Sequence, residues 1–139
     1  MPFPPRIFCD TSFFYACLDP GDANHDRAEA LVAEAVDAGC RLYTTWGIVS
    51  ETVTLSRYRL GFRAALAFLD EVKPVLHIVR CGERVNAEAE TVFRTYGRDH
   101  RLSFCDALSF VVVTTLLDRM PCLAFDRDFR NLGLRVIPS

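Results

Sequence analysis

Residues 6–12 read Arg6-Ile7-Phe8-Cys9-Asp10-Thr11-Ser12 and place an acidic side chain directly after a short apolar run. The apolar run predicts a buried β-strand, and the polar residues after it predict a turn into a helix that continues to Leu18. A carboxylate in such surroundings is costly to bury unless it has a partner. The segment therefore indicates an α/β fold with a candidate functional group, Asp10, at the end of its first strand.

The same alternation of short strands and helices continues along the chain. We expect further strands at residues 41–44, 75–79, 122–125 and 134–137. We expect helices at residues 23–38, 46–60, 62–72, 83–96 and 103–117, the first of them ended by Gly39 and the helix of residues 83–96 by Gly97. Strands that alternate with helices predict a three-layer α/β/α fold with a central, mainly parallel sheet of about five strands.

Length and composition limit the possible classes of protein. A chain of 139 residues is expected to form a single domain, covering residues 1–139. No apolar stretch approaches the roughly 20 residues of a membrane span, and the N-terminus carries no signal-peptide pattern, so we expect no membrane association and a cytoplasmic location. The six cysteines are scattered singly, which predicts reduced, buried thiols rather than disulfides or a zinc site.

Three further acids occupy positions related to that of Asp10. Asp126 follows the expected fourth strand, so in a parallel sheet its carboxylate and that of Asp10 emerge at the same edge. Asp106 lies in the first turn of the helix before that strand. Glu51 lies in the middle of a helix, where its neighbours Ile48 and Leu55 predict that it faces an apolar surface rather than solvent.

Each acid also has a purely structural explanation. Asp10 could cap the first helix, and Asp106 completes a capping box with Ser103. Asp126 and Asp128 could be turn residues on either side of Arg127. Glu51 could form a buried ion pair with Arg57 or Arg80. These explanations are separate coincidences, and all of them must hold together to remove the site, so the joint pattern favours a site.

The ligand types indicate which metal such a site would bind. All candidate donors are carboxylate oxygens, and none of the three histidines lies near a carboxylate at a spacing typical of zinc sites. Hard oxygen ligands favour Mg²⁺ or Mn²⁺, which keep positions open for water and phosphate. A phosphodiester is the kind of substrate that such a centre hydrolyses.

The basic residues favour a nucleic-acid partner. Fifteen of the sixteen are arginine, the residue suited to bidentate phosphate contacts and to stacking on bases. The candidates for RNA contact are Arg57, Arg59, Arg63, Arg101 and Arg127, with Arg94, Arg98 and Arg130 as further members of a rim. For any one of them, a solvated helix face is the alternative.

Four segments in this order resemble the PIN-domain ribonucleases, and most closely the VapC toxins of bacterial type II toxin–antitoxin systems. They are Phe8-Cys9-Asp10-Thr11-Ser12, Ser50-Glu51-Thr52, Leu102-Ser103-Phe104-Cys105-Asp106-Ala107 and Ala124-Phe125-Asp126-Arg127-Asp128-Phe129. The resemblance covers essentially the whole chain. The chain departs from it at Arg101, where many relatives have an acid, and at Leu123-Ala124, which offers no hydroxyl before Asp126.

The resemblance implies a metal-dependent endoribonuclease. Asp10, Glu51, Asp106 and Asp126 would be the acidic quartet that binds Mg²⁺ or Mn²⁺, with Asp128 as an auxiliary acid. Thr11 or Ser12 would orient Asp10 or a water. The resemblance also implies a cognate VapB-type antitoxin encoded alongside, and homodimerisation.

Two rival classes remain at this point. An aspartyl phosphatase needs a second Asp two residues after the first, but that position is Ser12, and the single lysine, Lys73, is badly placed for a receiver domain. A non-catalytic RNA-binding or protein-binding module of the same fold is the more serious alternative.

Overall fold

The computed structural model describes residues 3–138, in which five strands form one sheet. The strands are β1 (Arg6–Cys9), β2 (Arg41–Thr45), β3 (His77–Val79), β4 (Cys122–Leu123) and β5 (Val136–Ile137). Their spatial order is β3-β2-β1-β4-β5, and every pairing is parallel. The predicted parallel sheet of about five strands is therefore confirmed.

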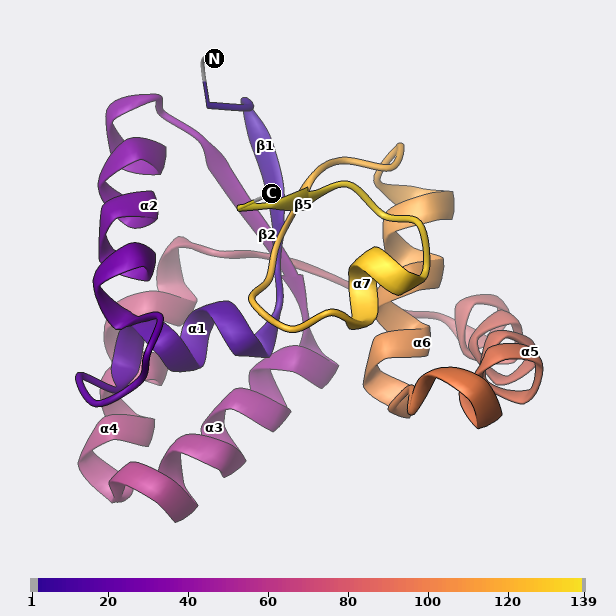
Figure 1. The fold of residues 1–139 in the computed structure, drawn as a ribbon, viewed down its shortest axis with the longest axis horizontal. Helices are drawn as coiled ribbons and strands as arrows, with labels where there is room; N and C mark the ends of the chain where they lie inside the picture. Colours follow the sequence, from indigo (N-terminus) through magenta and orange to yellow (C-terminus); the bar gives the residue numbers. More distant parts are fainter. Residues whose placement is uncertain (1–2, 139) are drawn as a thin grey trace.

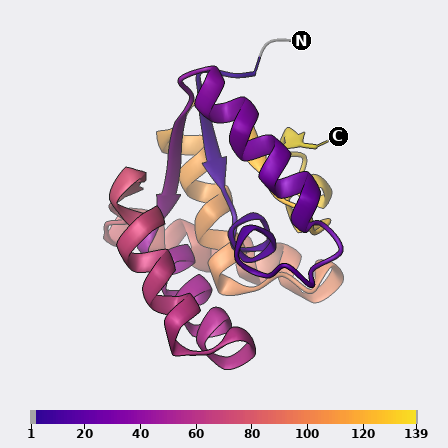
Figure 2. The ribbon, with the colours of Figure 1, turned by 90° about the vertical axis from the view of Figure 1, so that its left-hand side faces the viewer.

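Helices cover both faces of this sheet, as Figures 1 and 2 show. In Figure 2 the helices α2 and α4 stand in front of the strands, and α6 lies behind them. The α-helices are α1 (Thr11–Leu18), α2 (His25–Asp37), α3 (Trp46–Leu60), α4 (Phe62–Ala67), α5 (Glu83–His100), α6 (Phe104–Val111) and α7 (Asp128–Asn131). Shorter helical segments are η1 (Phe68–Val72), η2 (Lys73–Val75) and η3 (Val112–Leu116).

The central strand β1 explains why residues 6–12 decide the fold. Ile7, Phe8 and Cys9 are completely buried, as expected for a parallel strand that is covered on both faces. Phe8 is in register with Tyr43 of β2 and with Cys122 of β4. Because all five strands are parallel, their carboxyl ends lie at one edge, where β1 leads into α1.

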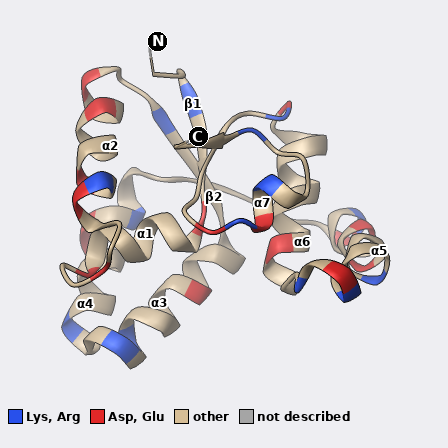
Figure 3. Cartoon of the chain, viewed as in Figure 1, with Lys and Arg blue, Asp and Glu red and all other residues tan. Residues whose placement is uncertain are grey.

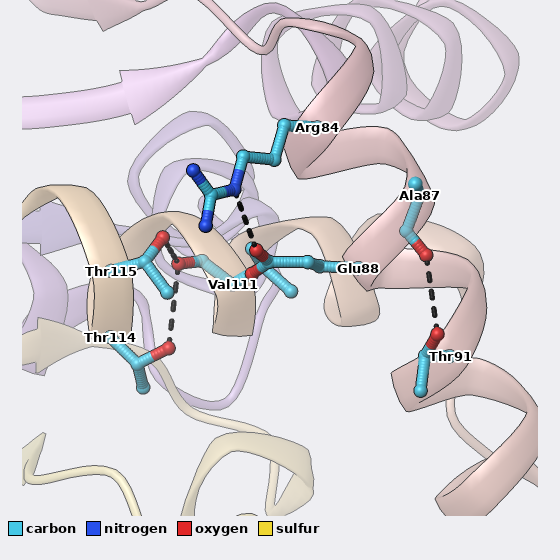
Figure 4. A network of polar contacts seen from close by, with 7 residues as sticks. All are labelled: Arg84, Ala87, Glu88, Thr91, Val111, Thr114 and Thr115. Carbon is cyan, nitrogen blue, oxygen red and sulfur yellow. Dashed lines mark hydrogen bonds and ion pairs between the residues drawn. The ribbon is translucent and has the colours of Figure 1, made fainter.

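Two predicted helices change character before they end. Residues 62–72 and 104–116 begin as α4 and α6 and continue as the π-helical segments η1 and η3. At η3 the side chains of Thr114 and Thr115 donate hydrogen bonds to the carbonyl oxygen of Val111, at 3.4 and 2.6 Å (Figure 4). Such back-bonding competes with the regular helical bonds, which fits the local widening of the helix.

The expectation that Gly97 ends its helix is wrong. Helix α5 continues through Gly97 to His100 and ends at Arg101, whose φ of 50° lies in the left-handed region. A glycine inside a helix costs only about 1 kcal/mol relative to alanine, so Gly97 alone does not have to end the helix. Three strands are also shorter than expected, since β3 begins at His77, β4 ends at Leu123 and β5 begins at Val136.

All six cysteines are free; Cys9 and Cys122 are buried and the other four are partly buried. Among residues 3–138, no helix has both the length and the apolar composition needed to span a bilayer.

Candidate functional site

Asp10 lies at the junction of β1 and α1 and is only 3% exposed. Its Oδ2 accepts hydrogen bonds from the backbone N–H of Ser12 at 3.1 Å and from the Ser12 hydroxyl at 2.7 Å. Asp10 is therefore the cap of α1, as its structural explanation predicted. The cap also fixes the direction in which the carboxylate points.

Ser12 connects this carboxylate to a distant part of the chain. Its Oγ donates to Asp10 and accepts a hydrogen bond from the backbone N–H of Phe125 at 3.0 Å. Phe125 immediately precedes Asp126, so the Ser12 hydroxyl holds the loop after β4 against the end of β1. The neighbouring Thr11 is buried, and its hydroxyl accepts a hydrogen bond from Thr52 of α3 at 3.4 Å.

Asp106 and Asp126 also make the local contacts that their sequence positions predicted. Asp106 Oδ2 accepts from the backbone N–H of Ser103 at 3.1 Å, and Ser103 Oγ accepts from the N–H of Asp106 at 3.0 Å, which completes the capping box. Asp126 Oδ1 accepts a hydrogen bond from the N–H of Asp128 at 3.3 Å. Asp126 lies three residues beyond the end of β4 rather than directly after it.

The four aspartates nevertheless gather at one place, and their electrostatics show this. Burial raises the pKa of Asp10 to about 7, with further contributions from the charges of Asp126 and Asp106. Burial and the charge of Asp106 also raise the pKa of Asp126. The pKa of Asp128 is raised to about 6 by burial and by the charges of Asp126 and Asp106. Capping and clustering therefore coexist in these residues.

Glu51 reaches the same place from α3, but not in the way the sequence predicted. Its side chain is exposed rather than turned toward an apolar surface, and it lines a cavity of about 400 Å³ together with Asp10 and Asp126. The expectation failed because helix neighbours define a face only where another element covers it, and Tyr58, one turn further, is itself 83% exposed. In residues 3–138, Glu51 forms no ion pair with Arg57 or Arg80.

Figure 3 shows the resulting distribution of charge, with acidic positions on α3, on α6 and at the start of α7 around the lower end of the strands. Within the described residues, the ion pairs involve only His25, Arg84 and Arg94 as the basic partner, and none of them reaches these acids. The acids therefore have no basic side chain in direct contact to compensate their charge.

The chemistry of this donor set fits a hard divalent cation, which would supply the missing positive charge. In residues 3–138, however, no three His, Cys, Asp or Glu side chains are arranged so that they could hold a metal ion. Two of the carboxylates already accept hydrogen bonds through one oxygen, Asp10 Oδ2 from Ser12 and Asp106 Oδ2 from Ser103. Ligation would require these carboxylates to use their other oxygens or to rotate.

The five arginines proposed to contact RNA have different surroundings in the structure. Arg59 lines the cavity with Asp10 and Glu51, and its guanidinium lies over the ring of Tyr15 at 5.4 Å. Arg57 instead lies over Phe62 at 5.0 Å. Of the other three, Arg63 is exposed on α4, Arg101 ends α5 and Arg127 precedes α7.

Sequence reasoning missed three further polar residues that line this cavity. Tyr15, Asp22 and Asn24 line the cavity from α1 and from the loop that follows it. The Tyr15 hydroxyl donates a hydrogen bond to Asp19 at 2.8 Å, and Asp22 accepts one from the N–H of Asn24 at 2.8 Å. The sequence Asp19-Pro20-Gly21-Asp22 is typical of a loop, but it carries no signal that this loop returns to the end of the sheet.

Comparison with known proteins shows which proteins this chain is similar to. Residues 7–134 match the PIN domain family. The chain is 34% identical over 131 residues to the 23S rRNA-specific endonuclease VapC20 of Mycobacterium tuberculosis, with 91% of this chain and 94% of that protein covered. It is 30% identical over 123 residues to a VapC ribonuclease of Archaeoglobus fulgidus, covering 86% of this chain and 76% of that one.

Solved structures give the same picture of the fold. The crystal structure of M. tuberculosis VapC20, described as a toxin that cleaves the sarcin–ricin loop, superimposes with a TM-score of 0.81 and 30% identity. That match covers 92% of this chain and 95% of the other. VapBC2 of Rickettsia felis, at a TM-score of 0.62 and 9% identity over 94% and 96% of the two chains, shares the fold.

Proposed function

Because the chain belongs to the PIN-domain family and resembles VapC proteins over nearly its whole length, we propose that it is a divalent-metal-dependent endoribonuclease of the VapC toxin type. The observation that carries the proposal is the convergence of Asp10, Asp126 and Glu51 on one cavity, with Asp106 close enough to raise the pKa of both other aspartates. We also propose that the protein is a single domain and that it acts in the cytoplasm.

The proposed metal ligands are Asp10, Glu51, Asp106 and Asp126, with Asp128 as an auxiliary acid. When bound, Mg²⁺ or Mn²⁺ would supply an activated water and positive charge toward the phosphate. Ser12 holds Asp10 in place through its 2.7 Å hydrogen bond, and Ser103 does the same for Asp106. Arg59, on the same cavity wall, is in position to contact a phosphate of the substrate.

RNA cleavage tests this proposal directly. We expect cleavage in Mg²⁺ or Mn²⁺, none in EDTA, and none by the Asp10→Asn/Asp106→Asn double variant. Ribosomal RNA is the first substrate to test because VapC20 is named for cleaving 23S rRNA. RNA binding without any cleavage under these conditions would instead identify a non-catalytic module of the same fold.

We further propose a VapB-type antitoxin as partner and a homodimer as the assembly. An apolar groove of about 620 Å³ between α1, α2 and η1 supports an antitoxin site; Phe14, Val32 and Val36 are among the residues that line it. Glu29 and Glu71 also line the groove, so an amphipathic segment with apolar anchors and a basic residue would complement it.

A further inference from the structure

A second pocket lies on the far side of the start of α6 from the aspartate cluster. It has a volume of about 550 Å³ and is lined by Glu90, Phe93, Arg94, Gly97, Arg98 and Phe104. Phe104 is two residues before Asp106 in the same helical turn, so the pocket and the acids are separated only by the width of α6.

The two phenylalanines that line this pocket are exposed to solvent although they are large apolar side chains. Phe93 and Phe104 are each 41% exposed, and their rings meet edge to face with centroids 6.0 Å apart and an interplanar angle of 61°. An edge-to-face pair leaves ring faces open to a third planar group. Core packing does not explain the pair, because both rings lie at the surface.

Gly97 lies against one face of the Phe93 ring, one helical turn away. A methyl group at Gly97 would lie 3.5, 3.6 and 3.7 Å from Cδ1, Cε1 and Cγ of Phe93. Nearly equal distances to three adjacent ring atoms place that methyl over the face of the ring rather than at its edge. Because that methyl position is one bond away from the Gly97 Cα, the backbone of α5 already lies against this part of the Phe93 ring, and a base would stack on the remaining ring surface of Phe93 and Phe104.

The charge around the rings favours an anionic chain. Glu90 lies 3.8 Å from Arg94 and offsets one positive charge, while Arg98 has no ion-pair partner within residues 3–138. Two arginines against one glutamate leave the pocket with a net positive charge. Aromatic faces combined with arginines are the typical surface for single-stranded nucleic acid.

We propose that this pocket binds an unpaired nucleotide of the RNA substrate, with its base stacked on Phe93 and Phe104 and an adjacent phosphate on Arg98. This inference rests on the proposed ribonuclease function and extends it, because the strand would cross the start of α6 to reach the acids. The pocket thereby selects single-stranded or looped RNA over a regular duplex, whose bases are not free to stack.

The test measures binding of single-stranded hexaribonucleotides by fluorescence anisotropy in Mg²⁺, in an Asp106→Asn background, with RNA integrity checked on a gel. The probes are hexauridylate, hexaadenylate and a hexamer with abasic sites, which carries the same phosphates but lacks bases. We expect the protein to prefer the base-bearing probes by about five- to hundredfold.

Phe93→Leu and Phe104→Leu are the sharpest variants. Each removes a ring on which a base could stack, so the base preference should disappear, whereas Phe62→Leu, at an exposed ring outside the pocket, should keep it. An unchanged preference in both Phe93→Leu and Phe104→Leu would overturn the proposal.

Arg98→Gln should weaken binding of base-bearing and abasic probes equally and reduce the salt slope by about 0.7. Arg84→Gln, at the other end of α5, is its matched control and should leave the slope unchanged. Light scattering on the same samples tests whether a second copy of the protein, and not RNA, occupies the pocket. If the leucine variants change the oligomeric state but not the base preference, the pocket is a contact between copies and the proposal is wrong.

The two proposals fail in different ways. Absence of cleavage by the unmodified protein in Mn²⁺ would overturn the proposed enzyme activity but not the base preference. Normal cleavage with no preference for bases over abasic probes would overturn the nucleotide pocket alone.

Discussion

The hydroxyl of Ser12 accepts a hydrogen bond from the backbone N–H of Phe125 at 3.0 Å, across 113 residues of sequence. The same hydroxyl donates to Asp10 at 2.7 Å. One side chain therefore fixes the end of β1, the loop after β4 and the direction of a buried carboxylate.

Ser12→Ala should reduce both stability and RNA cleavage. The change leaves the N–H of Phe125 without this partner and removes a donor from Asp10, at a cost of about 1–3 kcal/mol in the free energy of unfolding. Urea unfolding and the cleavage rate measure the two effects. Ser12→Thr keeps the hydroxyl and should recover most of both; a Ser12→Ala protein as active as the parent would contradict the assigned role.

Without metal, the protein should be less stable at pH 8 than at pH 5. Folded Asp10 holds its proton up to a pKa of about 7, whereas an unfolded aspartate loses it near 3.8. Between these values the folded state binds more protons, so stability falls as the pH rises. The loss should be about 1–4 kcal/mol, measured by urea unfolding in EDTA.

Asp10→Asn should remove the largest share of that pH dependence, with Asp126 and Asp128 supplying the rest, and it should stabilise the metal-free protein at pH 8. Added Mg²⁺ should stabilise the parent at pH 8 more than the variant, because its positive charge offsets the repulsion between the carboxylates. Asp70→Asn, at an exposed position on η1, is the control and should keep the parental profile. A parental profile in Asp10→Asn would show that Asp10 is not the titrating group.

Asp106 substitutions can separate capping from catalysis. Asn can still accept the hydrogen bond from Ser103 N–H, so the free energy of unfolding of Asp106→Asn should lie within about 1 kcal/mol of that of the parent. Its rate of RNA cleavage should fall by at least about a hundredfold. Asp106→Ala should lose the cap as well and unfold more easily. Thermal unfolding and cleavage of the same preparations test both; full activity of a folded Asp106→Asn protein would exclude Asp106 from the site.

Arg59→Gln should raise the KM for RNA and lower the salt slope of binding by about 0.7, because Arg59 lies on the wall of the acidic cavity. Arg57→Gln is a matched control two residues away, since Arg57 lies over Phe62 instead. Titration of both variants with RNA at several salt concentrations distinguishes them. Equal effects of the two substitutions would mean that only the general charge of α3 matters.

Val36→Glu should weaken antitoxin binding without reducing cleavage. Val36 is 73% exposed at the apolar groove, so a charge there costs little in the free protein but must be desolvated under a partner. Calorimetry with the product of the neighbouring reading frame measures the effect, and Val75→Glu offers a second position in the same groove. Unchanged affinity of both variants would place the partner elsewhere.

Much of the fold and part of the site could be predicted from local sequence. The burial of β1 followed from an apolar run without alternation, and the contacts of Asp10 and Asp106 followed from capping rules that act within three residues. Glu51 shows where such reasoning stops. Its helix was predicted correctly, but its exposure depended on which elements cover that helix, and the pattern of its neighbours did not contain this information.

The sequence by itself determined the strands, the helices and the placement of Asp10 near a strand end, because these depend on side-chain periodicity and on short-range backbone hydrogen bonds. Only the tertiary structure decided the strand order, the link from Ser12 to Phe125, the choice of Arg59 over Arg57 and the meeting of Phe93 with Phe104. These relationships join segments that are distant in sequence or depend on the direction of a flexible side chain. They are set by how helices and strands pack, which no local pattern specifies.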